Sequence, residues 1–198
     1  VRVGSLSSGA TRYLTGYISD ARVVKGTAVY TTAFTPPTAP LTAITNTSLL
    51  CNFTNGAIYD SAMMNDLETV GNAQISTTVK KYGTGSMSFN GSGSYLNAPT
   101  TQNVNFGTGN FTIEFWAYWN GGAFSTYNFA FDSRSGISPF TDGVGIGANI
   151  SNGYWYISFA SQELITSIAA TNAWQHIALV RNNGVFTLYI NGTSGGTY

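Results

Sequence analysis

The sequence contains few side chains arranged for bond-breaking chemistry. Hydrolysis of a glycosidic bond needs two carboxyl groups, about 5–5.5 Å apart in retaining enzymes, but Glu114 stands alone in its apolar segment. Asp66 and Glu68 are close in sequence, yet their segment is weakly structured and predicts a solvated loop. We expect Glu114 to be solvent-facing or hydrogen-bonded, on the sheet face opposite the apolar face of its strand. A place on a ligand-binding surface is the alternative.

The single histidine and the single cysteine do not complete a catalytic or metal centre. Zinc needs three or four ligands, and a catalytic thiol needs a neighbouring base. We expect His176 to be a structural, hydrogen-bonded residue and Cys51 to be a small buried core residue. Ser-His-Asp catalysis would need a nucleophile elbow such as G-x-S-x-G, and Gly91-Ser92-Gly93-Ser94 is not that motif. The sequence therefore predicts that the protein is not an enzyme.

Ligand recognition without catalysis is the other role that the side chains support. Sugar rings offer C–H faces and hydroxyl edges, so their sites combine an aromatic platform with planar polar groups. A two-sheet core also consumes aromatic residues, and we assign a structural role to Trp116, Trp155 and Trp174. The predicted ligand-binding residues are Trp119, Tyr127, Asn128, Asp132, Arg134, Asn149, Tyr154 and Tyr156.

Composition limits the partners. The 198 residues carry 8 Lys or Arg and 8 Asp or Glu, so the net charge is zero. Phosphate binding needs clustered cations, which argues against nucleic acid as a partner. No apolar run reaches the length of about 18 residues that a membrane span needs, so we expect no membrane insertion. Ser, Thr and Asn fill the surface, a composition that is common in extracellular, fibre-like and viral structural proteins.

Strands must position these side chains. Segments 111–119 and 153–159 alternate in polarity or size, which is the period of a β-strand. Helical signals are weak, and segment 60–70 predicts one turn at most. Many short strands separated by Gly and Asn turns predict an all-β sandwich or jelly roll.

Two Asn-Gly pairs predict hairpins near the end of the sequence. Segments 177–181 and 185–190 flank Asn182-Asn183-Gly184, which is a strong short-range hairpin signal. Asn191-Gly192 begins another hairpin, for which the sequence shows no second strand downstream.

Four segments follow one another in a recognisable order, and a fifth precedes them. They are 86–96 (a strand and turn ending in Tyr-Leu), 111–116 (F-T-x-x-x-W), 174–181 (W-x-H-x-A), 186–192 (L-Y-x-N-G) and, ahead of these, 16–22 (G-Y-I-S-D-A-R). Together they resemble the laminin-G-like branch of the concanavalin A-like lectin/glucanase superfamily, over most of the chain. The resemblance implies a jelly-roll sandwich of two antiparallel sheets, and usually binding rather than catalysis.

The fifth segment is out of order for that family, where it forms the final strand. The terminal strands of the fold are thus placed first in this chain. The stretch 35–40 is rich in proline, cannot lie within a central strand, and marks a boundary. We divide the chain into closing strands of a laminin-G-like module (1–38), a Pro/Thr-rich linker (39–47) and the main body of a jelly roll (48–198).

Two arrangements can complete the fold. Residues 1–38 can close this same sandwich, because the family's first and last strands lie side by side and nearby termini permit circular permutation. Alternatively, they close the preceding module of a tandem array, and sequence beyond Tyr198 completes residues 48–198. We favour the array, because short connections between sequential elements are the default.

The resemblance also implies a cofactor to consider. Many relatives bind calcium at the rim of the sandwich through carboxylates and carbonyl oxygens. Asn90 and Ser94 stand where the family motif often has Asp, which weakens such a site. Asp132 and Asp142 remain as candidate calcium ligands, with turn capping as the alternative role of each. No other cofactor is expected.

Modules of this Thr/Asn-rich style resemble those of phage tail fibres, virion-associated proteins and bacterial surface adhesins. The predicted function is non-catalytic binding of glycans or cell-surface polysaccharide, in a tandem array of a phage fibre, virion protein or adhesin. The alternative is a purely structural or decoration module that contacts neighbouring copies through its strand edges. Both predict a location on the virion or at the extracellular cell surface.

Overall fold

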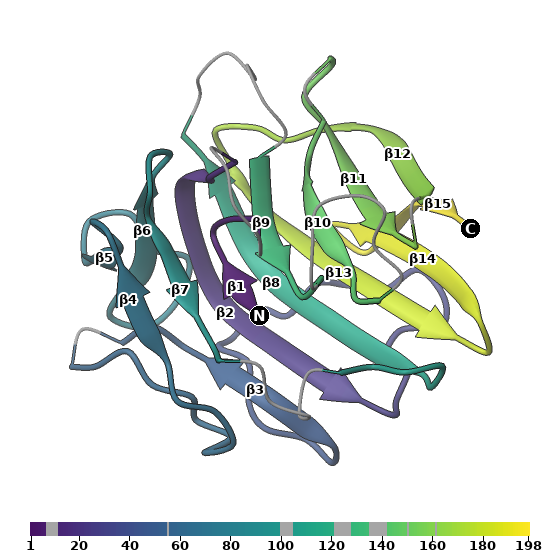
Figure 1. The fold of residues 1–198 in the computed structure, drawn as a ribbon, viewed down its shortest axis with the longest axis horizontal. Coiled ribbons are helices and arrows are strands. Elements are labelled where there is room, and N and C mark those ends of the chain that lie inside the picture. Colours follow the sequence, from purple (N-terminus) through teal and green to yellow (C-terminus); the bar gives the residue numbers. More distant parts are fainter. Residues whose placement is uncertain are drawn as a thin grey trace.

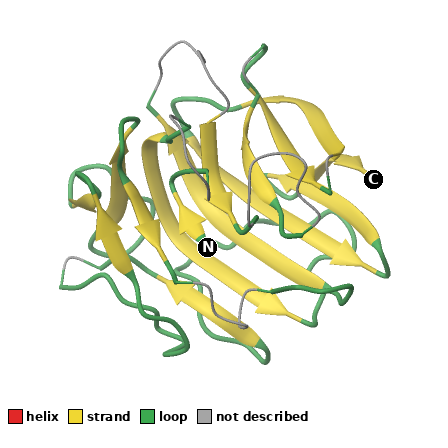
Figure 2. Cartoon of the chain, in the orientation of Figure 1, coloured by secondary structure: helices red, strands yellow, loops and turns green. Residues whose placement is uncertain are grey.

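The computed structural model describes residues 1–6, 12–54, 56–99, 105–120, 128–134, 142–149, 151–160 and 162–198. Within these residues the chain forms strands and loops, without a helix (Figure 2). It follows that these residues contain no helix long and apolar enough to cross a membrane. The predicted all-β class is confirmed, because two sheets of antiparallel strands lie face to face as a sandwich (Figure 1).

Fifteen strands are present in the described residues, and they form two sheets. Sheet A consists of β12 (Gln162–Ala169), β11 (Tyr154–Phe159), β10 (Gly145–Ala148), β9 (Asn128–Asp132), β1 (Arg2–Val3), β7 (Tyr95–Asn97) and β4 (Glu68–Val70), in this spatial order. Sheet B consists of β15 (Thr193–Thr197), β14 (Val185–Ile190), β13 (Trp174–Asn182), β8 (Phe111–Trp119), β2 (Thr15–Lys25), β6 (Ser86–Asn90) and β5 (Gln74–Ser76), with β3 (Thr47–Cys51) also paired to β2.

One hydrophobic core fills the space between the sheets. Strand β8 contributes every second residue to it, including Phe111, Ile113 and Phe115, each about 1% exposed or less. Strand β11 contributes Trp155 and Ile157 from the facing sheet, both fully buried. The alternation seen in the sequence therefore separates core residues from those on the outer faces of the sheets.

The strands nearest the N-terminus lie in the middle of both sheets. Strand β1 pairs with β7 on one side and β9 on the other, while β2 lies between β8 and β6 in sheet B (Figure 1). Strand β3 pairs with the second half of β2, from Ala21 to Val24. In this structure residues 1–38 thus complete the sandwich of their own chain, and a tandem array stays a prediction.

Residues 26–46, which join β2 to β3, lie across the outer face of sheet B; we call them the strap. The Val29 amide donates to Thr112 Oγ1 (2.8 Å), and the Phe34 amide donates to the Gly192 carbonyl (2.9 Å). Farther along, the Tyr82 hydroxyl donates to the Pro37 carbonyl (2.8 Å). The proline-rich stretch predicted as a joint between modules therefore covers a sheet in this chain.

Local details confirm one predicted hairpin and one predicted turn, and they correct one other expectation. Strands β13 and β14 form the hairpin, with Asn183 and Gly184 both at positive φ (50° and 86°). The second hairpin is also complete, because β15 pairs with β14 after the turn at Asn191 and Gly192. Segment 60–70 contains the single turn that was expected, in which the Met63 amide donates to the Asp60 carbonyl (2.9 Å), and the segment then runs into β4.

Candidate functional site

Asp132 and Arg134 form a closed ion pair on sheet A. Arg134 Nε donates to Asp132 Oδ1 (2.9 Å) and Nη2 donates to Oδ2 (2.7 Å), while Nη1 donates to Ser158 Oγ (2.9 Å). The guanidinium also lies 4.5 Å from the centroid of the Phe129 ring. Asp132 is fully buried and Arg134 is 4% exposed. The polar groups of these two predicted ligand-binding residues therefore bind each other, as in other buried bidentate ion pairs.

Tyr156 lies in the same region but is also closed to solvent. It packs with Leu6 and Phe129 in a small apolar cluster on sheet A, and it has no exposed surface. Burial raises the pKa of its hydroxyl above the ordinary value for tyrosine. The structure therefore brings Asp132, Arg134 and Tyr156 together, but as part of the packing rather than as an accessible platform.

The other predicted ligand-binding residues are spread over the fold. Trp119 belongs to the core, where its ring meets Trp155 edge to face at 6.0 Å. Asn149 is buried and its Oδ1 accepts the Ser151 amide (2.8 Å), so it shapes a turn. Asn128 and Tyr154 are half-buried, and Tyr127 lies outside the described residues.

The two residues named for calcium do not fit a shared cation site. Both carboxylate oxygens of Asp132 accept hydrogen bonds from the Arg134 guanidinium, whose charge would repel a cation at the same oxygens. Asp142 is exposed and lies on a different loop. Within the described ranges, no group of three or more His, Cys, Asp or Glu side chains could hold a metal ion.

Glu114 lies at the centre of a second buried polar cluster, on the outer face of sheet B beneath the strap. Arg22 donates to Oε1 through Nε (2.9 Å) and Nη2 (2.5 Å). The Tyr30 hydroxyl donates to Oε2 (2.7 Å), and His176 Nε2 lies 3.2 Å from the same oxygen. Glu114 and His176 are both fully buried. The expected roles of a hydrogen-bonded glutamate and a structural histidine are confirmed.

The ionisation of Glu114 follows from its partners. Burial by itself raises the pKa of this carboxyl group, but the hydrogen bond with His176, the charge of Arg22 and the Tyr30 hydroxyl outweigh burial, and the net pKa is lowered. The same arrangement raises the pKa of Tyr30, first through burial and then through the nearby carboxylate. Glu114 is thus a fixed anion, with no place for a substrate.

Three aromatic side chains form a row on the outer face of sheet B, beyond the strap. Tyr17 of β2 pairs with Tyr118 of β8, and Tyr118 pairs with Trp174 of β13, so the three lie side by side on adjacent strands. Their ring centroids are 5.9 Å and 5.7 Å apart, with edge-to-face geometry. All three are half-buried. Tyr17 and Tyr118 were not predicted as ligand-binding residues, and Trp174 was expected to have a structural role.

Uncharged residues border this aromatic row. Ser88 of β6 pairs with Tyr17, and the exposed Asn120 and Asn172 lie in the loops next to Tyr118 and Trp174. Within the described part of the chain, the hydroxyl groups of Tyr17 and Tyr118 and the Trp174 indole N–H make no hydrogen bonds. The row thus combines apolar ring surface with polar groups that are available to a ligand.

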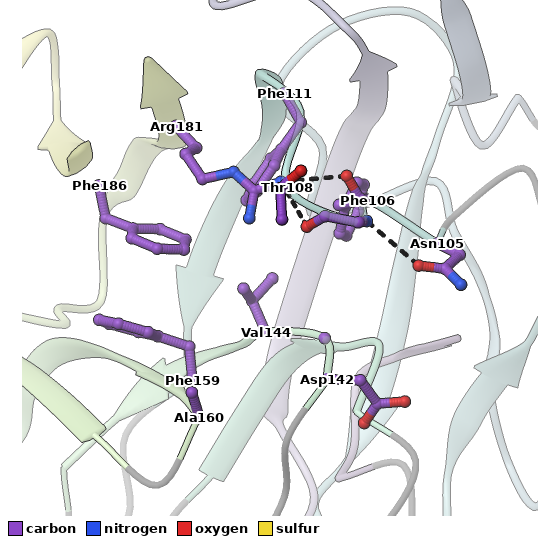
Figure 3. Close-up of a pocket in the computed structure, with 12 residues that line it drawn as sticks. Asn105, Phe106, Thr108, Phe111, Asp142, Val144, Phe159, Ala160, Arg181 and Phe186 are labelled. Carbon is purple, nitrogen blue, oxygen red and sulfur yellow. Dashed lines mark hydrogen bonds between the residues drawn. The ribbon is translucent and has the colours of Figure 1, made fainter. Parts of the chain in front are cut away.

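A cavity of about 360 Å³ opens at one end of the sandwich, between the sheets (Figure 3). Its apolar walls include Phe106, Val144, Phe159 and Phe186, and Arg181 lies at its side. The predicted calcium ligand Asp142 also borders this cavity. No sequence pattern marked the site, because its residues come from four strands and two loops that are far apart in the sequence.

Comparisons with known proteins agree with the architecture. The family Laminin G 3, described as the concanavalin A-like lectin/glucanases superfamily, matches residues 90–198, which is more than half of the chain. Neither the curated proteins nor the solved structures gave a significant match. The matched region includes β8, β13 and β14, which carry three of the sequence motifs. The chain therefore belongs to the Laminin G 3 family of the concanavalin A-like lectin/glucanase superfamily.

Proposed function

We propose that this protein is a non-catalytic carbohydrate-binding module, and that the aromatic row Tyr17–Tyr118–Trp174 is the surface on which it binds. The observation that carries the proposal is the alignment of three half-buried aromatic rings on adjacent strands. Sugar rings stack their C–H faces on such rings, while hydroxyl groups of the sugar meet the polar tips.

The surroundings of the row favour a neutral glycan over a charged one. Ser88, Asn120 and Asn172 are uncharged, and amide and hydroxyl groups suit the hydroxyl edges of a sugar. The whole chain has a net charge of zero and only 8% charged residues. A neutral cell-surface polysaccharide therefore matches the chemistry of this surface better than an acidic polymer, which would need clustered cations.

The polar cluster below the strap supports binding without catalysis. A glycoside hydrolase needs one carboxyl group as acid and a second as nucleophile or base. Glu114 is buried, and its oxygens are held by Arg22, Tyr30 and His176. Among the described residues this cluster contains no second carboxylate.

A screen of neutral glycans, followed by variants of the row, tests the proposal. Trp174→Ala and Tyr118→Ala should each weaken binding by about tenfold or more, as truncation of a central aromatic contact does. Tyr59→Ala is the matched control, because Tyr59 is 52% exposed and lies outside the row; its affinity should be unchanged. Thermal unfolding of each variant separates loss of contact from loss of fold. Equal affinities for all the proteins would disprove the assignment of the row.

A structural role in assembly is the second candidate, and the edge of sheet A favours it. Strand β12 is eight residues long and pairs only with β11 in the sheet order, and its Ile165 is 44% exposed. Such an edge can pair with a neighbouring copy. A screen that finds no glycan, together with self-assembly of the purified chain in sedimentation experiments, would favour this role. For either role we infer a place on a virion fibre or a surface adhesin.

A further inference from the structure

The cavity between the sheets has properties that the aromatic row does not share. Its volume of about 360 Å³ lies within the range of roughly 300–1,000 Å³ typical of small-molecule sites. It is lined by the start of β8, the end of β11, the end of β13 and the start of β14. The cavity is therefore held by strands of both sheets, and it lies at the end of the sandwich rather than on a sheet face.

Aromatic side chains give the cavity apolar walls. The rings of Phe159 and Phe186 stack at 4.3 Å, and the rings of Phe106 and Phe111 stack at the same separation. The Phe111 and Phe186 rings meet edge to face at 6.0 Å, which joins the two pairs into one wall, and Val144 also lines the cavity (Figure 3). These walls suit an apolar body the size of a single ring, and they offer few partners for the many hydroxyl groups of a sugar.

Arg181 supplies a positive charge at the side of this apolar space. Nε donates to the Gly109 carbonyl (2.7 Å), and Nη2 donates to the carbonyls of Phe106 (3.0 Å) and Gly107 (2.8 Å). These bonds fix the guanidinium against neutral oxygens. Within the described part of the chain, Arg181 has no carboxylate partner, and its Nη1 makes no hydrogen bond.

Arg181 is half-buried, and in this respect it differs from Arg22 and Arg134, which are buried. Arg22 is paired with Glu114, and Arg134 is paired with Asp132. Burial without a carboxylate lowers the pKa of Arg181 below its ordinary value. Asp142 borders the cavity, but Figure 3 shows its carboxylate on the opposite side from the guanidinium. An anion in the cavity would therefore supply the charge partner that the described residues do not.

We propose that the cavity binds a small organic carboxylate whose body is a single apolar ring. The ring lies in the cavity against the joined wall of phenylalanine rings and Val144, and the carboxylate accepts a charge-assisted hydrogen bond from Arg181 Nη1. This ligand differs from the neutral glycan of the aromatic row, and the proposal does not depend on the row.

Titration with benzoate, followed by NMR, tests this site. Benzamide is the neutral probe of similar shape, and the proposal predicts that benzoate binds about tenfold or more tightly than benzamide. Arg181→Gln should abolish this preference, because it removes the charge. Lys80→Gln is the control, since Lys80 is exposed and the substitution changes the net charge equally without touching the cavity. Trp174→Ala, which tests the glycan row, should leave benzoate binding unchanged.

Each outcome decides the proposal. Arg181 also holds the 106–109 loop, so Arg181→Lys provides a second variant that retains the charge if Arg181→Gln fails to fold. It should keep the preference for benzoate. No binding of benzoate by the unmodified protein, equal binding of benzamide, a preference that survives in Arg181→Gln, or its loss in a folded Arg181→Lys would each overturn the inference.

Discussion

At the scale of single residues, Glu114 connects more of the fold than any side chain considered for catalysis. It lies on β8, and its partners come from β2 (Arg22), the strap (Tyr30) and β13 (His176). A buried ion pair contributes little net stability because desolvation offsets the attraction, but removing one partner leaves an uncompensated charge. The cluster therefore ties the strap to one arrangement over sheet B.

Replacing Glu114 by Gln should lower the free energy of unfolding by about 3–5 kcal/mol at neutral pH, because buried Arg22 loses its counter-charge. Urea denaturation measures the change. Glu163→Gln on β12, where the side chain is exposed, is the control and should change stability little.

The lowered pKa of Glu114 also predicts how the loss of stability in Glu114→Gln depends on pH. A carboxyl group whose pKa is lowered in the folded state stabilises the fold above the ordinary glutamate pKa, near 4.3, and loses this contribution as the pH falls through its folded pKa. The difference between Glu114→Gln and the unmodified protein should therefore shrink in acid. An equal difference at pH 7 and at strongly acid pH would contradict the role given to this carboxylate.

At the scale of elements, the strap decides which part of sheet B is accessible. The strap covers Thr112 and Glu114 of β8, and it leaves Tyr118, farther along the same strand, half-exposed. The strap also comes close to the backbone at Gly192, in the turn between β14 and β15. There the chain has φ +79°, and a Cβ atom would collide with the Phe34 carbonyl oxygen.

Gly192→Ala should therefore displace the strap as well as strain the turn. Gly184→Ala is the matched control, because Gly184 has a similar φ of +86° and open space around it. The control should cost about 1–2 kcal/mol for the left-handed conformation, and Gly192→Ala should cost about 1–3 kcal/mol more for the collision. Thermal unfolding gives the difference, and equal costs for the two variants would show that the strap moves without penalty.

At the scale of the whole molecule, the first 25 residues join the two halves of each sheet. Strand β1 links β9 to β7 in sheet A, and β2 links β8 to β6 in sheet B. Without these strands each sheet would separate into two pieces with exposed edges.

A fragment of residues 48–198 should therefore fail to unfold cooperatively in circular dichroism. Adding residues 1–46 as a separate peptide should restore a cooperative transition, because the paired strands need no covalent link to their neighbours. A fragment that folds alone as a monomer would contradict the structural role of β2. Restoration would also show that the same segment can complete a sandwich in trans, as a tandem array requires.

The sequence by itself determined the class of the fold and its local parts. Alternation in 111–119 and 153–159, and the Asn183-Gly184 turn, act over a few residues, so strands, core faces and a hairpin could be predicted from them. The segment 193–197 could not, because Thr-Ser-Gly-Gly-Thr carries no alternation and becomes a strand only through pairing with β14.

Only the tertiary structure decided which side chains are accessible. Arg22 meets Glu114 across 92 residues of sequence. The aromatic row depends on the register of β2, β8 and β13, three strands that are far apart in the sequence. Asp132 and Tyr156 were predicted to meet a ligand, but the packing of sheet A buries them. Trp174 was expected to have a structural role, and only the register of β13 with β8 shows that it lies half-buried beside Tyr118. Burial and register are set by the packing of the whole chain, and local patterns do not specify them.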